Sequence, residues 1–127
     1  MMTTTNQIRI IIVDDNRVVR EGLSIFLKIF EDLDFVGEAR SGAEAVKLCD
    51  ELKPDVVLMD IQMPKMTGIE ATKIISEKYP NIKIIGLTSL PSTSPQQQEI
   101  VAVGAVACLQ KQASIDEILS TIRNALP

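Results

Sequence analysis

The segment Ile10-Ile11-Ile12-Val13-Asp14-Asp15 joins a short run of large apolar residues to two carboxylates. A second segment, Val56-Val57-Leu58-Met59-Asp60, has the same form and ends on a third carboxylate. Continuous apolar runs of this length are typical of strands that helices cover on both faces, as in a parallel sheet. The two segments therefore predict an α/β fold in which acidic side chains lie at the tips of buried strands.

Short apolar runs alternate with amphipathic stretches of helix length along the whole chain, which predicts five strands, each followed by a helix. The strands are expected at 8–13, 34–38, 55–60, 82–88 and 105–110. The helices are expected at 17–30, 42–52, 67–78, 95–103 and 115–126. Right-handed crossovers between such units give a five-stranded parallel sheet of the flavodoxin-like, doubly wound (βα)5 class, with strand order 2-1-3-4-5.

Four of the five expected helices begin with a capping-box signal, in which Ser or Thr is followed three residues later by Glu or Gln. The pairs are Ser41 and Glu44, Thr67 and Glu70, Ser94 and Gln97, and Ser114 and Glu117. In the last helix, one apolar face is predicted to hold Ile115, Ile118, Leu119 and Ile122. The capping signals and the apolar periodicity therefore predict the same helices, which supports the alternation of strands and helices.

The composition limits the classes of protein that this chain can form. Its 127 residues suffice for one domain, and 46% of them are hydrophobic and 24% charged, as in a globular protein. No apolar stretch approaches the roughly 20 residues of a membrane span. The first residues lack the features of a secretory signal, so we expect a cytoplasmic protein. The net charge of −4 would repel nucleic acid, and the absence of histidine excludes imidazole chemistry within the chain.

Chemically active side chains fall at the carboxyl ends of the predicted strands, where ligands bind in doubly wound sheets. They are Asp14, Asp15, Asp60, Thr88 and Lys111. Polar residues are common at strand ends, so each one alone says little. Five of these types at one edge of a sheet are hard to attribute to chance, and they indicate a shared site.

The residue types at this edge suit phosphoryl chemistry. Mg²⁺ prefers oxygen ligands and keeps several waters, so Asp14 or Asp15 together with Asp60 would hold it, with Mn²⁺ as an alternative metal. Beside the metal, Asp60 would be a nucleophile of the kind that forms an acyl phosphate. Lys111 would offer a charge, and Thr88 a hydroxyl, to phosphoryl oxygens. We therefore expect a site that accepts a phosphoryl group and holds it.

Over essentially its whole length the chain resembles the receiver domain of bacterial two-component response regulators. The matching segments are Ile11-Ile12-Val13-Asp14-Asp15-Asn16, Pro54–Pro64, Thr67-Gly68 and Lys111. Val36-Gly37-Glu38-Ala39 and Gly68-Ile69-Glu70-Ala71-Thr72 look most like receivers of the NarL/LuxR-type transcription factors.

This resemblance assigns roles to individual residues. It implies that Asp60 is the phosphoacceptor, that Asp14 and Asp15 hold Mg²⁺, and that Gln62 offers its backbone carbonyl to the metal. Thr88, with its neighbour Ser89, and Lys111 would read the phosphoryl group. The donor would be a phosphohistidine on a sensor histidine kinase. Exposed residues of the first helix, such as Arg17, Arg20 and Lys28, would contribute to recognition of that kinase.

The chain departs from the family pattern at two places. Cys108 occupies the position, three before the lysine, that usually holds an aromatic switch residue. We expect Cys108 and Cys49 to be reduced thiols in or near the core. The segment 89–104 contains two prolines and three successive glutamines. It is expected to form either a mobile or displaced helix or an ordinary fourth helix with a polar face. The apolar Leu90 beside the site predicts a phosphorylated lifetime of minutes or longer.

We interpret residues 1–127 as a single receiver domain without its output domain, a regulatory phosphoacceptor and not an enzyme. Phosphorylation would shift its conformation and its self-association, giving a dimer, and would act on transcription through a helix-turn-helix domain outside this chain. We expect no nucleic-acid binding by this domain alone and no membrane partner. The alternatives are a stand-alone receiver, an interaction module that does not use phosphorylation, and an aspartate-nucleophile phosphatase, which the adjacency of Asp14 and Asp15 disfavours.

Overall fold

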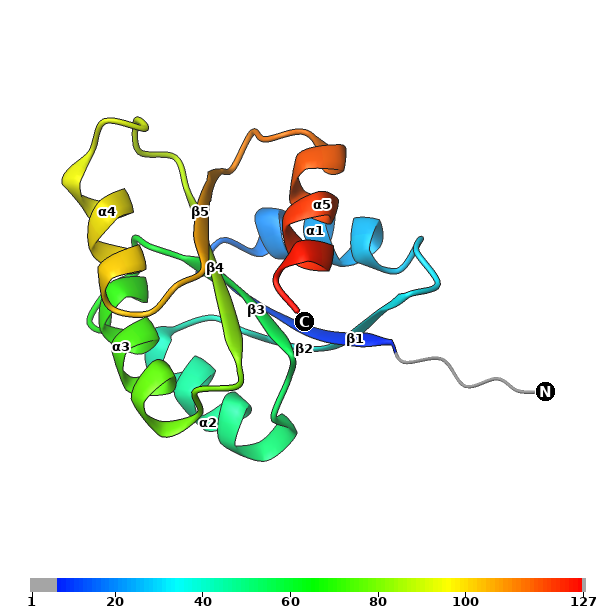
Figure 1. The fold of residues 1–127 in the computed structure, drawn as a ribbon, viewed down its shortest axis with the longest axis horizontal. Coiled ribbons are helices and arrows are strands. Elements are labelled where there is room, and N and C mark those ends of the chain that lie inside the picture. Colours follow the sequence, from blue (N-terminus) through cyan, green and yellow to red (C-terminus); the bar gives the residue numbers. More distant parts are fainter. Residues whose placement is uncertain (1–6, 127) are drawn as a thin grey trace.

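A parallel sheet organises residues 7–126, the part of the chain that this computed structural model describes (Figure 1). Its strands run in the order β2-β1-β3-β4-β5, and every neighbouring pair is parallel. The strands are β1 (Ile8–Val13), β2 (Leu33–Ala39), β3 (Val56–Asp60), β4 (Lys83–Thr88) and β5 (Ala107–Gln110). The predicted flavodoxin-like topology is confirmed.

Helices cover both faces of the sheet, α1 and α5 on one side and α2, α3 and α4 on the other (Figure 1). They are α1 (Arg17–Leu27), α2 (Gly42–Leu52), α3 (Gly68–Lys78), α4 (Pro95–Ala102) and α5 (Ile115–Asn124). None of the helices between residues 7 and 126 is long and apolar enough to cross a membrane.

Successive residues of the central strands face opposite sides, which explains why their sequences are apolar without alternation. Ile11 and Val57 belong to the cluster under α2, α3 and α4. Ile12 and Leu58 belong to the second cluster, under α1 and α5. All four side chains are fully buried, so neighbouring apolar residues of these strands contribute to two different cores.

The helix caps agree with the sequence at three of the four predicted sites. Thr67 forms a complete capping box with Glu70, and the hydroxyls of Ser41 and Ser114 accept the N–H groups of Glu44 and Glu117. Ser94 occupies the N-cap position of α4 as predicted, but the predicted capping hydrogen bond is absent, because its side chain makes no cap hydrogen bond.

The partner expected for Ser94 is engaged elsewhere. The amide of Gln97 donates to the carbonyl oxygens of Leu90 and Pro91, at 3.4 and 3.3 Å, and so binds the β4–α4 loop instead of the cap. The segment 89–104 nevertheless contains a regular helix, α4, that is held by the fully buried Ile100. The structure thus shows the ordinary helix with a polar face.

Other details differ from the sequence predictions, since β5 begins at Ala107 and not at residue 105, and α5 ends at Asn124 and not at residue 126. Helix α1 ends at Leu27 and not at residue 30, although Phe30 still packs edge-to-face on Phe26, with ring centroids 5.4 Å apart. Ile115 is 53% exposed, because it stands at the first turn of α5, while Ile118, Leu119 and Ile122 are buried. Arg20, expected on the surface for kinase recognition, is buried. Arg17 and Lys28 are exposed as expected.

Candidate functional site

The ends of four strands bring the predicted site residues to one edge of the sheet. Asp14 directly follows β1, and Lys111 directly follows β5. Asp60 and Thr88 are the last residues of β3 and β4. The backbone N–H of Lys111 donates to the carbonyl of Thr88 at 2.8 Å, which fixes the end of β5 beside that of β4.

Three carboxylates form a compact acidic cluster at this edge. One oxygen of each of Asp14, Asp15 and Asp60 lies within 4.8 Å of the others. Asp14 and Asp60 are 1% and 3% exposed, whereas Asp15 is open to solvent. An oxygen-only donor set with one open side fits a hard, partly hydrated divalent cation such as Mg²⁺.

The Lys111 ammonium lies between two of these carboxylates. Its Nζ is 2.9 Å from Asp14 Oδ2 and 3.3 Å from Asp60 Oδ1. Burial alone would lower the pKa of Lys111, but the hydrogen bond to Asp14 and the charge of Asp60 outweigh burial and raise it. Lys111 is therefore a fixed positive charge at neutral pH.

Asp60 is held in a setting that disfavours its own charge. Burial, followed by repulsion from Asp14, raises its pKa to about 6, against the partial opposition of Lys111 and of the Gln62 N–H. That N–H donates to Asp60 Oδ1 at 3.3 Å. A second positive charge at the acidic cluster would favour the ionised carboxylate, which is the form that attacks phosphorus.

Thr88 and Ser89 differ in their access to the site. Thr88 is fully buried, and its hydroxyl oxygen accepts the N–H of Leu90 at 3.0 Å. Since that bond uses only a lone pair, the Thr88 hydroxyl proton stays free to be donated. Ser89 is exposed at the start of the loop.

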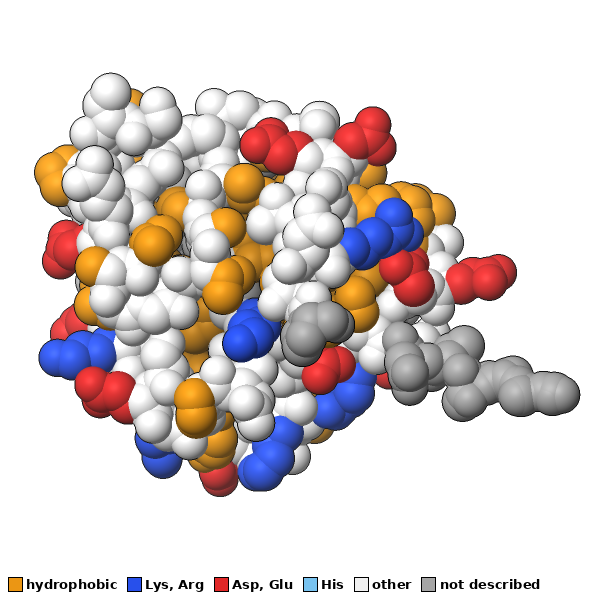
Figure 2. Space-filling view, in the orientation of Figure 1, with side chains coloured by type: hydrophobic (Ala, Val, Ile, Leu, Met, Phe, Trp, Pro, Cys, Tyr) orange, Lys and Arg blue, Asp and Glu red, His pale blue; other side chains and the backbone are white. Residues whose placement is uncertain are grey.

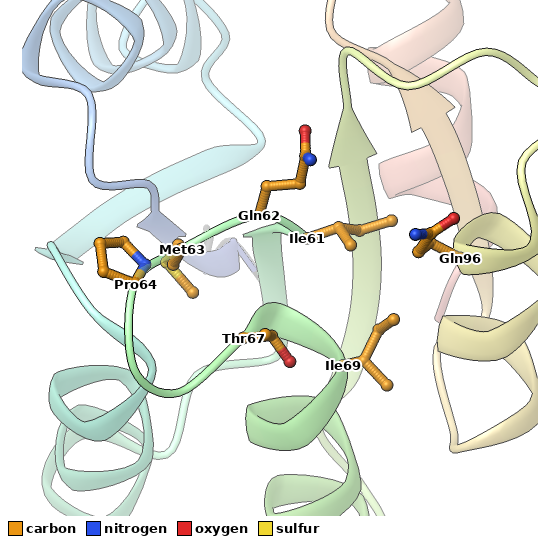
Figure 3. Close-up of a pocket in the computed structure, with 7 residues that line it drawn as sticks. All are labelled: Ile61, Gln62, Met63, Pro64, Thr67, Ile69 and Gln96. Atoms are coloured by element: carbon orange, nitrogen blue, oxygen red, sulfur yellow. The ribbon is translucent and has the colours of Figure 1, made fainter.

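A shallow groove borders the site between the β3–α3 loop and α4 (Figure 3). Its lining consists of Ile61, Gln62, Met63, Pro64, Thr67, Ile69 and Gln96. Ile61 and Ile69 point along the groove toward Gln96, while the Gln62 side chain projects away from it (Figure 3). Because the loop begins at Asp60, a movement of the loop would reshape this groove.

Cys108 lies on β5 facing α4, where it lines a second shallow groove with Ser92, Gln97, Gln98 and Val101. Its thiol is half-buried, and burial raises its pKa, so it is present as the neutral thiol. Cys49 is fully buried, and burial raises the pKa of that thiol to about 12. Both cysteines are free, as expected.

Arg20 also reaches this site, and the sequence did not indicate it as a site residue. Its Nη1 donates to the backbone carbonyl of Asp14 at 2.8 Å. The available signal was its position on α1 directly after Val19, at the flank of the apolar face, where a long polar side chain can turn inward.

The doubly wound fold with an acidic cluster at one edge of its sheet is typical of signalling receiver domains, and comparison with known families agrees. The family model described as the response regulator receiver domain matches residues 10–123. The chain belongs to this family.

Curated relatives are bacterial transcriptional regulators. The transcriptional regulatory protein LnrK of Bacillus subtilis is 43% identical over 115 residues, which are 91% of this chain and 52% of LnrK. The transcriptional regulatory protein LiaR of the same organism is 42% identical over 118 residues, 93% of this chain and 56% of LiaR. The chain thus spans about half the length of these relatives.

Solved structures show the same fold. The response regulator domain of Thermotoga maritima CheB superimposes with a TM-score of 0.88 at 37% identity, covering 94% of this chain and 96% of that one. A DNA-binding response regulator of the LuxR family from Staphylococcus aureus gives 0.83 at 32% identity, covering 92% and 97%. The predicted NarL/LuxR-type resemblance is confirmed.

Proposed function

We propose that this chain receives a phosphoryl group on Asp60 from a phosphohistidine of a sensor histidine kinase. The observation that carries the proposal is the Asp60 carboxylate itself, which is buried at the tip of β3, is paired with the Lys111 ammonium and lies within 4.8 Å of the carboxylates of Asp14 and Asp15. An Asp60 oxygen would bond to phosphorus as the bond between phosphorus and the histidine nitrogen breaks, and the imidazole would leave.

The remaining site residues would bind and neutralise the transferred group. Asp14, Asp15 and the backbone carbonyl of Gln62 would hold Mg²⁺, which when bound neutralises the charge of the carboxylates and of the phosphoryl oxygens. Lys111 would turn from Asp14 toward a phosphoryl oxygen. The hydroxyl of Thr88 would donate a hydrogen bond to a second phosphoryl oxygen. Ser89 would lie at the entrance of the site.

Phosphorylation would then change the loops that follow Asp60 and Thr88. The Leu90 N–H is bonded to the Thr88 hydroxyl, so movement of Thr88 would move the start of the β4–α4 loop. Cys108, in place of the aromatic switch residue, leaves a groove beside α4 that would make this rearrangement sterically easy.

The output would be control of transcription, as the names of LnrK and LiaR suggest. It would act through self-association and a helix-turn-helix domain of a longer protein. Apolar side chains lie on the face formed by α4, β5 and α5, where charged groups stand mainly at the periphery (Figure 2). Val101, Val106 and Ile115 are exposed on these elements and the turn before β5. Such a face would support a dimer in the cytoplasm, while the net charge of −4 opposes DNA binding by this part.

Intact mass after incubation with Mg²⁺ and a small acyl-phosphate donor tests the proposal. We expect one phosphoryl adduct in the unmodified protein, and none for Asp60→Asn or after chelation of the metal. Asp116→Asn, an exposed aspartate on α5, is the matched control and should keep the adduct.

A second candidate function is an interaction module that does not use phosphorylation, which the small side chain of Cys108 at the switch position favours. Such a module would bind its partner equally well with Asp60→Asn. No adduct from either the small donor or a phosphorylated kinase would exclude the first proposal in favour of this one.

A further inference from the structure

Arg20 on α1 is an unusual residue to find in the interior of a small domain. It is 7% exposed, and an arginine in such a place is costly unless its donors are paired. Its helix position does not require it, because α1 packs on the sheet through Phe26 and Leu27. Its contacts must therefore offset its burial.

The guanidinium joins two elements beside the acidic cluster. Nε donates to Glu38 Oε1 of β2 at 2.7 Å, and Nη1 donates to the carbonyl oxygen of Asp14 at 2.8 Å. On the other side of the same residue, the Asp14 N–H donates to the carbonyl of Ala39 at 3.1 Å. Both peptide groups of Asp14 are thus attached to the end of β2, one directly and one through Arg20.

We propose that Arg20, oriented by Glu38, is a positioning residue for the metal-binding carboxylates Asp14 and Asp15. The inference rests on the function proposed above, and it assigns a role to an ion pair, between the buried Arg20 and the half-exposed Glu38, that the phosphoryl chemistry itself does not use. Near the acidic cluster, the hydrogen bond of Arg20 goes to the backbone carbonyl of Asp14 and not to the carboxylate oxygens of Asp14 or Asp15.

The choice of a backbone acceptor is what suits Arg20 to this role. An arginine paired with the Asp14 carboxylate would occupy oxygens that a cation needs. Bonded to the carbonyl, it fixes the turn and leaves Oδ1 to the Asn16 N–H and Oδ2 to Lys111. Metal ligands are commonly held by a surrounding layer of hydrogen bonds, whose loss weakens metal affinity about 10–100-fold.

Glu38 completes the arrangement through charge. A lone guanidinium this close to the cluster would repel a divalent cation, whereas the Glu38 carboxylate at 2.7 Å compensates it. The pair then contributes rigidity with little net charge. It also ties α1 to β2, so a purely structural role must be distinguished from positioning.

The chain contains a matched control in the ion pair of Arg123 and Asp32. Arg123 Nε is 2.7 Å from Asp32 Oδ2, and the pair joins α5 to the residue before β2. Arg123→Met removes one positive charge, as Arg20→Met does. Both of its side chains are about half-exposed and lie outside the acidic cluster.

The experiment is a Mg²⁺ titration that is monitored by calorimetry and by the amide NMR signals of Asp14 and Asp15. The variants are Arg20→Met, Arg20→Lys, Glu38→Gln and Arg123→Met. We expect Arg20→Met to weaken Mg²⁺ binding about tenfold or more. Arg20→Lys should recover only part of this loss, since an ammonium lacks the planar fork that joins two partners. Glu38→Gln should weaken binding more at low than at high ionic strength, and Arg123→Met should match the unmodified protein.

A second readout separates positioning from general stability. With Arg20→Met, the Mg²⁺ concentration at half-maximal phosphoryl uptake should rise, while the rate at saturating Mg²⁺ stays within a few-fold of the unmodified protein. Equal Mg²⁺ affinity for Arg20→Met and Arg123→Met would overturn the inference. If Arg20→Met does not fold, Arg20→Lys with undiminished affinity would overturn it instead. Absence of Mg²⁺ binding by the unmodified protein would refute the proposed function itself.

Discussion

In the proposed function, Asp60 would combine two properties that oppose each other, since a nucleophile must be charged and a buried group resists charge. Burial and Asp14 raise its pKa to about 6, so the free site is destabilised when Asp60 ionises. Relief of this repulsion by a cation would stabilise the protein and activate the nucleophile in one event. Stability and reactivity at this residue are therefore linked.

Asp60→Asn is expected to stabilise the metal-free protein at neutral pH. The raised pKa means that the cost of ionisation is absent below the ordinary value of 3.8 and is complete above about 6. Asparagine does not ionise, so the gain should be on the order of 1–3 kcal/mol at pH 7.5 and close to zero at pH 4. Urea unfolding in the presence of a chelator measures it, and a gain that does not depend on pH would refute this explanation.

Leu90 is expected to slow loss of the phosphoryl group from Asp60. Leu90 lies two residues after Thr88 in the chain. Its half-buried, apolar side chain offers no hydrogen bond to an attacking water. A lifetime of minutes or longer should follow, and Leu90→Asn should shorten it several-fold. The adduct is timed by intact mass after removal of the donor, with Gln112→Ala as control. Loss within seconds in the unmodified protein would contradict the prediction.

At the scale of single elements, the start of α3 packs against the end of β3, the strand that carries Asp60. The Gly68 N–H donates to the Ile61 carbonyl at 2.8 Å. A Cβ at Gly68 would collide with the Asp60 carbonyl oxygen and lie 2.8 Å from the Ile61 Cα. Because both neighbours are backbone atoms, only glycine lets the helix begin so close to the site.

Gly68→Ala and Gly22→Ala should have opposite effects. At Gly68 the added methyl must push α3 away from β3, so we expect a loss of about 1–3 kcal/mol and weaker phosphoryl uptake. At Gly22, within α1, nothing lies within 4 Å of the added atom, and a gain of about 0.5–1 kcal/mol is expected. Thermal unfolding of the two variants checks both signs, and a loss at both positions would contradict the packing argument.

The β4–α4 loop is held by side-chain amides from the two elements beside it. Gln110 of β5 donates to the Leu90 carbonyl at 2.7 Å, and Gln97 of α4 donates to the same oxygen at 3.4 Å. Gln110→Ala should therefore speed amide hydrogen exchange in residues 89–94 several-fold without changing that of β1 or β3. Gln98→Ala, which removes an exposed side-chain amide from α4, is the control and should leave hydrogen exchange in the loop unchanged.

The sequence predicted most of these elements because strand burial leaves a clear pattern. The apolar runs of β1 and β3 placed both strands within one residue, and Thr67 placed the start of α3. The end of α1 was missed because Phe30 packs on the core from a turn as well as it would from a helix. Arg20 was predicted on the surface because local periodicity cannot show that its guanidinium will form an ion pair with a residue distant in sequence, Glu38.

At the scale of the whole molecule, two apolar clusters lie on opposite sides of one sheet. Ile11→Val and Ile12→Val remove a methylene each from different clusters, and each should cost about 0.5–1.5 kcal/mol. Although the residues are neighbours in sequence, the costs should add within about 0.5 kcal/mol, because no packing partner is shared. Double-mutant analysis of chemical unfolding measures this. A coupling beyond 1 kcal/mol would show that the sheet transmits packing changes between its faces.

The attachment of Asp14 to the end of β2 ties the acidic turn to an edge strand, which has a neighbour on one side alone. Edge strands can shift or fray more readily than central ones. A protein that binds β2 or α1 would therefore act on Asp14, one of the proposed metal ligands, through Glu38 and Arg20 without entering the site. A docked protein could in this way tune the readiness of the site before any chemistry begins, and the edge of the sheet would serve as an input for control.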